Sequence, residues 1–247
     1  PVKEFDENHY VFMATSKGTV KKTALDEFSR PRPSGIIAVG LDEGDYLVGA
    51  ALTDGKYDVM LFSSDGKSVR FVEADVRPMG RQATGVRGMR LAAEQRVVCM
   101  LAAKDESRSV LTATEKGYGK RTLISEYPRH GRGGQGVIAI QTSGRNGAVI
   151  GAVLVEEDDE VMLISTGGVL IRTAVAQIRE TGRSAQGVTL ISLGEGEKLA
   201  GLERIEERDV NGNGNGNGHG AEGNGGAGPD AGGDVEPDAP TPGPTVH

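Results

Sequence analysis

A pattern that recurs about every fifty residues constrains the fold of this chain more than any other feature. Four segments align without gaps, and each has an apolar run, a hydroxyl residue, two small or polar residues, a glycine and a second run. A short polar segment with glycine between two β-prone runs is what a tight hairpin turn requires. Each unit therefore predicts a β-hairpin, with these glycines at the turns: Gly18, Gly66, Gly117 and Gly168.

A second glycine recurs between the hairpins, and apolar residues follow it at the first and fourth places: Gly35, Gly85, Gly136 and Gly187. Each of these glycines is expected to open another strand, and a further apolar run follows in most units. One period thus holds about four short strands and no stretch with helical apolar spacing, which matches a propeller blade. We predict an all-β, propeller-like fold with about four blade repeats. Stacked β-sandwiches remain the structural alternative.

The repeats and the end of the chain differ in composition. Residues 1–206 carry 27 basic and 28 acidic side chains, whereas residues 207–247 carry one basic and seven acidic ones, with 12 glycines and 5 prolines. We predict a partial propeller domain over 1–206 and a disordered, low-complexity tail over 207–247. The first unit lacks its opening strands, so closure of the ring is expected to depend on sequence upstream of Pro1. The tail is interpreted either as a solubilising appendage or as a regulator that competes with a polyanion for the domain.

Several classes of function lack their motifs. No apolar run is long enough to span a membrane, and no signal pattern or phosphate-binding loop occurs. The four histidines are scattered, and the acidic run 156–160 is interpreted as a solvated loop rather than a metal site. The single cysteine, Cys99, is expected to be a small buried hydrophobe in a reducing compartment. We therefore expect a protein outside the membrane, with no active site and no cofactor in this segment.

Cations recur at fixed places in the repeats. One set lies four residues after each turn glycine, and lysines precede two of its members: Lys22, Arg70, Arg121 and Arg172, with Lys21 and Lys120. A second set lies four residues before the second-pattern glycines, and two arginines flank the equivalent place in the first unit: Arg81, Arg132 and Arg183, with Arg30 and Arg32.

Equivalent positions on successive blades would spread these cations round one belt. A belt of cations suits duplex DNA, because each neutralised phosphate releases counterions and the contacts carry no sequence information. We therefore predict both sets as DNA contacts, the first as primary and the second as secondary. The alternative is a protein-interaction propeller in which the cations only protect exposed strand edges.

The repeats resemble a known family. Val11-Phe-Met-Ala-Thr-Ser-Lys-Gly-Thr-Val-Lys-Lys-Thr23, Thr84-Gly-Val-Arg-Gly-Met-Arg-Leu91 and Gly117-Tyr-Gly-Lys-Arg-Thr122 are similar to the C-terminal domain of the bacterial DNA gyrase A subunit. The resemblance implies a β-pinwheel, a six-bladed propeller variant whose neighbouring blades exchange strands and whose basic rim wraps DNA. It further implies an ATP-dependent type II topoisomerase, an isomerase that introduces negative supercoils and acts in the cytoplasm on the chromosome. Its partners would be the gyrase B subunit, together with the N-terminal part of the A subunit, in a heterotetramer of two A and two B subunits.

The chain departs from that family pattern in two respects. The family's diagnostic box, Gln-Arg-Arg-Gly-Gly-Lys-Gly, appears only as the degenerate copy Gly131-Arg-Gly-Gly-Gln-Gly136, so the true box is expected upstream of Pro1. All five tyrosines fall in blade repeats, so the resemblance places the DNA-cleaving tyrosine elsewhere. It likewise places ATP in the B subunit, with Mg²⁺ in that subunit too and in the cleavage core. The C-terminal domain of the topoisomerase IV A subunit remains a close alternative.

Overall fold

The computed structural model describes residues 2–205, and these form an all-β fold of consecutive antiparallel hairpins. The four predicted hairpins are present: β1 (Tyr10–Thr15) with β2 (Thr19–Ala24), β4 (Asp58–Ser63) with β5 (Lys67–Val72), β8 (Ser109–Thr114) with β9 (Tyr118–Leu123), and β12 (Glu160–Ser165) with β13 (Leu170–Ala174). The turn glycines have φ between +79° and +86°, a left-handed conformation that explains why glycine recurs there. The predicted tail, 207–247, lies outside the described residues.

Each hairpin ends in a short 3₁₀ turn that leads the chain away from the sheet: η1 (Leu25–Phe28), η2 (Glu73–Asp75), η3 (Ile124–Glu126) and η4 (Val175–Gln177). An apolar residue lies ten positions after each turn glycine, at this exit from the hairpin, and it is buried in three repeats, at Val76, Tyr127 and Ile178. Phe28, the equivalent residue of the first repeat, is half-buried.

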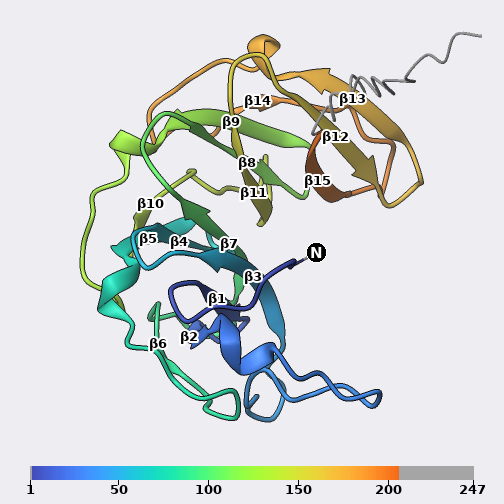
Figure 1. The fold of residues 1–247 in the computed structure, drawn as a ribbon. Helices are drawn as coiled ribbons and strands as arrows, with labels where there is room; N and C mark the ends of the chain where they lie inside the picture. Colours follow the sequence, from blue (N-terminus) through green and yellow to red (C-terminus); the bar gives the residue numbers. More distant parts are fainter. Residues whose placement is uncertain (1, 206–247) are drawn as a thin grey trace, which may run out of the picture. The chain divides into compact units, whose positions relative to one another are not determined.

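The strand that closes each repeat pairs with the first strand of its own hairpin: β3 (Leu47–Thr53), β7 (Val97–Ala103), β11 (Val149–Val155) and β15 (Leu199–Ile205). Successive members of this set contact one another, β3 with β7, β7 with β11 and β11 with β15. We call them the inner strands, since they form the edge at which neighbouring sheets meet (Figure 1).

Three two-residue strands lie at the opposite edge of the sheets and belong to a different repeat from the hairpin they join: β6 (Val86–Arg87), β10 (Val137–Ile138) and β14 (Val188–Thr189). Strand β6 pairs with β2, β10 with β5 and β14 with β9, so each repeat gives its strand back to the preceding sheet. The sheet orders are β3-β1-β2-β6, β7-β4-β5-β10 and β11-β8-β9-β14. This exchange is the one that distinguishes a pinwheel from an ordinary propeller, as the resemblance implied.

The first and last described repeats lack one partner of this exchange. The fourth sheet has the order β15-β12-β13, and no described strand pairs with the outer edge of β13. In the first repeat, the counterpart of β6 is the segment 35–39, which pairs with no strand among residues 2–205. The exposed side chains Ile37 and Leu170 lie at these two places, 60% and 57% accessible.

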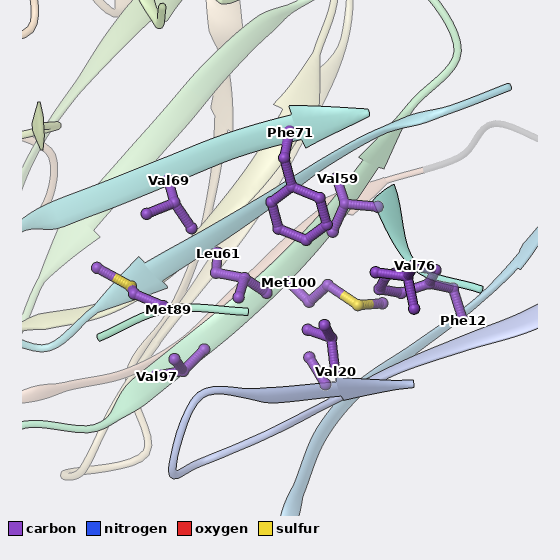
Figure 2. Close-up of a cluster of buried hydrophobic side chains, with 11 residues drawn as sticks. Phe12, Val20, Val59, Leu61, Val69, Phe71, Val76, Met89, Val97 and Met100 are labelled. Carbon is purple, nitrogen blue, oxygen red and sulfur yellow. The ribbon is translucent and has the colours of Figure 1, made fainter. Parts of the chain in front are cut away.

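The core lies between successive sheets rather than on one face of a single sheet. Phe12 and Val20 from the first sheet pack against Leu61 and Phe71 from the second, with Met100 of the inner strand β7 among them (Figure 2). Burying each such side chain contributes on the order of 1.5–3 kcal/mol. Because sheets stack on both sides, all six residues of β4 are buried, and so are all six of β8.

Candidate nucleic-acid interface

The structure places most of the first cation set inside the protein rather than on the predicted outer belt. The accessible fractions of Lys21, Lys22, Arg70 and Lys120 are 1%, 5%, 3% and 0%. The placement of these four residues on a DNA-facing surface is therefore wrong. The physical reason is that both faces of the second strand are covered in the first three hairpins, so that Lys21 and Lys22, consecutive residues whose side chains point to opposite faces of β2, are both buried.

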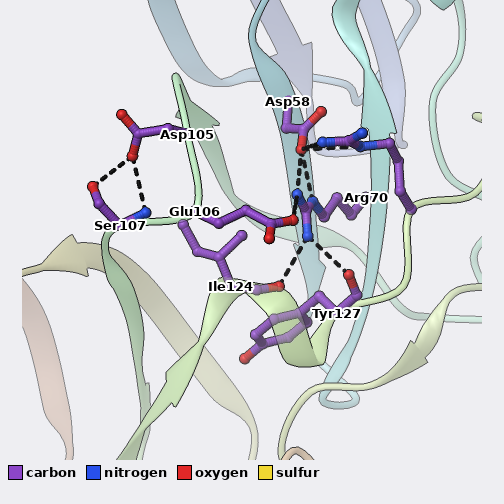
Figure 3. Close-up of polar contacts among 8 residues, drawn as sticks. Asp58, Arg70, Asp105, Glu106, Ser107, Ile124 and Tyr127 are labelled. Carbon is purple, nitrogen blue, oxygen red and sulfur yellow. Dashed lines mark hydrogen bonds and ion pairs between the residues drawn. The ribbon is translucent and has the colours of Figure 1, made fainter.

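Arg70 on β5 shows what a buried cation does in this fold (Figure 3). Its Nε donates to Oδ2 of Asp58 at 2.9 Å, and its NH1 donates to the carbonyl oxygens of Ile124 and Tyr127 at 3.0 and 3.1 Å. Its NH2 pairs with Asp58 and Glu106. The carbonyl of Ile124 lies in the 3₁₀ turn η3 of the next repeat and that of Tyr127 directly follows this turn, so Arg70 fastens one repeat to its neighbour.

Lys22 makes the equivalent connection between the first and second repeats. Its Nζ lies 3.3 Å from the carbonyl oxygen of Glu73 and 3.7 Å from the Oε1 of the same residue, at the start of η2. The Nζ also lies 4.7 Å from the centre of the Tyr10 ring, a cation–π contact. Buried charge is costly unless it is paired, and these contacts satisfy it.

Lys21 and Lys120 hold the segment that carries the exchanged strand. The Nζ of Lys120 donates to the carbonyl oxygens of Gly182 and Arg183, both at 2.6 Å. The Nζ of Lys21 donates to those of Ala38, at 2.7 Å, and Arg81. Burial lowers the pKa of Lys21, and it lowers the pKa of Lys120 to about 8, because desolvation disfavours the charged amine.

The two remaining members of the first set are more accessible. Arg121 is half-buried, and its carbonyl oxygen accepts a bond of 2.9 Å from the backbone N–H of Thr181. Its Nε is buried and has no hydrogen-bond partner among the described residues. Arg172 lies on the exposed outer strand β13 and pairs with Glu160.

The second cation set lies at the outer edge, on the segments that follow the 3₁₀ turns and that lead, in the second to fourth repeats, to an exchanged strand. We call these segments the crossing arms, 29–35, 77–85, 128–136 and 179–187. In three arms the same contact recurs, in which NH1 of the arm's arginine donates to a carbonyl oxygen on the preceding repeat: Arg81 to Ile37 at 3.0 Å, Arg132 to Arg87 at 3.1 Å and Arg183 to Ile138 at 2.9 Å.

These arm arginines differ in accessibility. Arg132 is exposed, whereas Arg81 and Arg183 are half-buried, and Arg30 and Arg32 are exposed on the first arm. The carbonyl contacts use only part of each guanidinium, so further N–H groups remain to bind phosphate oxygens. The second set therefore fits the predicted outer surface better than the first.

Two cations that the repeat analysis missed lie beside Arg132. Arg87 is on the exchanged strand β6, and Arg90 follows three residues later; both are exposed. The equivalent positions in the next repeat are Ile138 and Gln141. Residues shared by all repeats do not include cations that occur in only one of them. Both arginines do lie in the segment 84–91 that carries the family resemblance, and that segment is the sequence signal that could have marked them.

Other chemical groups in residues 2–205 do not converge on a site. Within this range no three acidic, histidine or cysteine side chains are placed to hold a metal ion, and no helix is long and apolar enough to cross a membrane. Cys99 donates its thiol to the carbonyl oxygen of Ala152 at 3.1 Å. Burial raises the pKa of this thiol to about 11, which disfavours the reactive thiolate, although the residue is half-buried where a fully buried one was predicted.

Comparison with known proteins places the repeats in context. The family model described as DNA gyrase C-terminal domain, beta-propeller, matches residues 9–54, 57–103, 108–156 and 159–206. The DNA gyrase A subunit of Pseudomonas aeruginosa is 58% identical over 198 residues, which cover 80% of this chain and 21% of that protein. Its Escherichia coli counterpart is 50% identical over 207 residues, which cover 84% of this chain and 24% of that protein. The chain thus spans about a fifth to a quarter of the length of these relatives.

Solved structures agree with these matches. The C-terminal domain of DNA topoisomerase IV superposes with a TM-score of 0.79 at 25% identity, covering 83% of this chain and 64% of that one. The DNA gyrase A C-terminal domain superposes with a TM-score of 0.75 at 27% identity, covering 83% and 68%. The fold therefore resembles that of both solved domains about equally. Sequence identities of 50% and 58% are found with A subunits of gyrase.

Proposed function

Because the chain belongs to the family of DNA gyrase C-terminal domains, we propose that it binds duplex DNA along the outer edges of its sheets and bends the duplex there. The prediction of the family from the repeat motifs is confirmed. The DNA contacts themselves are the proposal.

The recurring arm arginines are the observation that carries this proposal. Arg81, Arg132 and Arg183 occupy equivalent places on successive sheets, and a backbone carbonyl orients each guanidinium. Successive contacts of this kind suit a long, evenly charged ligand better than a compact one. Contacts to phosphates position the duplex without reading its bases, so binding is expected to be independent of sequence.

The arrangement also suits bending. Smooth bending of a 20–30 bp site by 40–90° costs on the order of 1–6 kcal/mol. Phosphate contacts distributed over three or four arms can offset that cost, whereas a single basic patch touches too short a length of duplex to hold it bent. The buried cations contribute by holding neighbouring repeats at fixed spacing.

The role of the whole protein follows from the family. We propose that the module serves a type II topoisomerase whose B subunit supplies ATP hydrolysis and whose A subunit supplies the cleaving tyrosine from its N-terminal part. The assembly would contain each subunit twice, and it would act on the chromosome in the cytoplasm. The wrapped duplex would then be presented for strand passage so that negative supercoils are introduced.

Duplex binding at two salt concentrations tests the proposal. Random-sequence duplexes of about 20 and 60 bp are titrated with the chain, and the log of the association constant is expected to fall by roughly 0.9 per phosphate contact for each tenfold rise in salt. The longer duplex, labelled at both ends, is expected to show increased energy transfer when it bends. Absence of salt-dependent binding would overturn the proposal in favour of a protein-interaction propeller.

A further inference from the structure

We propose that the third crossing arm and the exchanged strand beside it form a phosphate anchor, a point where the DNA backbone is gripped more tightly than on the other arms. The inference rests on the proposed function and deepens it. The crossing arms occupy equivalent places in the repeats, but we assign stronger DNA binding to one of them than to the others. Three arginines compose the anchor: Arg87, Arg90 and Arg132.

Backbone hydrogen bonds bring these three arginines together from two repeats. The N–H of Arg90 donates to the carbonyl oxygen of Gly134 at 2.8 Å, and the N–H of Gly133 donates to that of Gly88 at 2.6 Å. Arg132 reaches over this contact, since its NH1 donates to the carbonyl oxygen of Arg87 and its Nε donates to that of Asp75 at 3.0 Å. The third arm therefore lies along the segment that follows β6, and the cluster has a fixed backbone.

The cluster carries charge that the described residues leave uncompensated. All three side chains are exposed, and none of them forms an ion pair with a carboxylate among residues 2–205. Arg90 and Gln135 line one shallow hollow of about 180 Å³, together with Lys67 and Asp65. The Asp65 carboxylate is held by Ser63 and lies 3.6 Å from the Nζ of Lys67. The guanidinium groups of Arg87 and Arg90 thus make no hydrogen bond or ion pair within residues 2–205 and are available to bind a ligand.

Glycines in the third arm give a second, independent observation. Gly133 and Gly136 have φ of +84° and +78°, so their backbone conformation requires glycine. Gly131 and Gly134 lack a positive φ, and a Cβ built on either would meet no described atom closer than 3.9 Å. No internal contact explains these two glycines. Gly144, Gly151 and Gly182 are equally open and also lack a positive φ, so open space alone does not mark a binding site. The third arm differs because its bare backbone lies beside three arginines, and this combination fits the sugar–phosphate chain of a duplex.

The distribution of charge along the chain points to the same place. Residues 57–103 carry seven basic and five acidic side chains, and residues 108–156 carry seven and three. The flanking repeats are the reverse, with five basic and six acidic side chains over 9–54 and five and seven over 159–206. The third arm joins the two basic repeats, so the long-range field of the domain favours a polyanion at the anchor.

Paired charge-neutralising variants of the full chain test the anchor. Arg87→Gln with Arg90→Gln removes two charges whose side chains make no hydrogen bond or ion pair among residues 2–205, so folding is expected to be unchanged. The matched control, Arg96→Gln with Lys104→Gln, removes two exposed charges of similar sequence position at the ends of the inner strand β7. The dissociation constant for a random 60-bp duplex is measured by fluorescence anisotropy over a range of salt. The anchor variant is expected to bind on the order of tenfold more weakly, with a salt slope reduced by about 2.

A glycine variant tests the close approach without changing charge. Gly134→Leu is expected to weaken duplex binding by more than about threefold, because its side chain would occupy the space assigned to the DNA backbone. Gly144→Leu is the control, since a Cβ at Gly144 also meets no described atom within 4 Å and the residue is likewise exposed. The thermal unfolding midpoint of each variant shows that the folded protein is being compared.

The outcomes separate the anchor from the general function. If the wild-type chain binds duplex DNA and both anchor variants bind as well as their controls, the anchor is excluded and DNA binding by the arms stands. If the wild-type chain itself shows no salt-dependent duplex binding, the proposed function fails. Weaker binding by the arginine pair and by Gly134→Leu, with unaffected controls, supports the anchor.

Discussion

The hairpin strands and the crossing arms both carry cations at regular positions, yet they place them in opposite surroundings. On the second strand of a hairpin, Arg70 is 3% accessible and holds four partners from its own and the next repeat. On the third arm, Arg132 is exposed and contacts two carbonyl oxygens among the described residues. The difference teaches that one residue type serves two purposes here, joining sheets in the interior and offering charge at the outer edge.

The largest expected effect comes from removing an interior cation. Arg70→Ala leaves the buried Asp58 carboxylate and two carbonyl oxygens without their main donor, so the free energy of unfolding should fall by about 3–5 kcal/mol. Urea denaturation followed by circular dichroism measures this change. Arg129→Ala is the control, because Arg129 is a half-exposed second partner of Asp58, and its loss should cost less than about 1 kcal/mol. Equal effects of the two variants would contradict the assignment of Arg70 as the interior connection.

A smaller effect is expected at the other interior position. Lys120→Met keeps most of the apolar stem but leaves the carbonyl oxygens of Gly182 and Arg183 without a donor, at a cost of about 1–3 kcal/mol. Native hydrogen exchange should show the loss locally, as faster exchange of amides in the fourth arm and β14. Stability unchanged from the wild type would mean that this arm is held by its backbone pairing alone.

Replacing an arginine at the outer edge should affect DNA binding more than stability, the reverse of what is expected for the interior cations. Arg183→Gln loses one hydrogen bond to the carbonyl oxygen of Ile138, so stability should fall by only about 0.5–1.5 kcal/mol. Duplex affinity should fall together with about one unit of salt slope. Thermal unfolding and anisotropy titration of the same preparation give both quantities. A large loss of stability with unchanged affinity would make this arginine another interior connection.

A further effect is a dependence of stability on alkaline pH. The pKa of Lys120 is about 8 in the folded chain against an ordinary value of 10.5, so between these values the unfolded chain binds more protons than the folded one. Stability linked to Lys120 should therefore rise with pH across that window. Wild type and Lys120→Met are compared by urea denaturation at roughly pH 7 and pH 10, so that other titrating groups largely cancel. A stability difference that is constant or falls with pH contradicts the assignment.

The sequence predicted the hairpins well, because their turns depend on local chemistry. Gly18 and Gly117 need a left-handed backbone, and that need is visible as a fixed residue type at a fixed spacing. The exchange of strands is different, since Val86 and Arg87 pair with a hairpin more than sixty residues earlier in the chain. Nothing in the spacing distinguishes this pairing from one within the same repeat, and only the family resemblance implied it.

The burial of the cations could not be predicted from the spacing of the repeats, for a related reason. Lys21 and Arg70 recur with the period of the repeat, and a period shows that positions are equivalent without showing which surroundings they share. Stacking of the next sheet decides that they are buried. Arg87 illustrates the opposite failure, because it occurs in one repeat only and a search for shared positions ignores it.

Strand exchange has a mechanical consequence for a protein that holds a bent ligand. Each arm is covalently part of one repeat while its strand is hydrogen-bonded to the sheet before it, as β10 is to β5. A bent duplex would pull on an arm as it tends to straighten. This force would act on two sheets at once, and neither sheet could move without displacing the other. Under the proposed function the load would spread along the row of sheets, and the described repeats would resist straightening of the DNA as a linked series rather than one at a time.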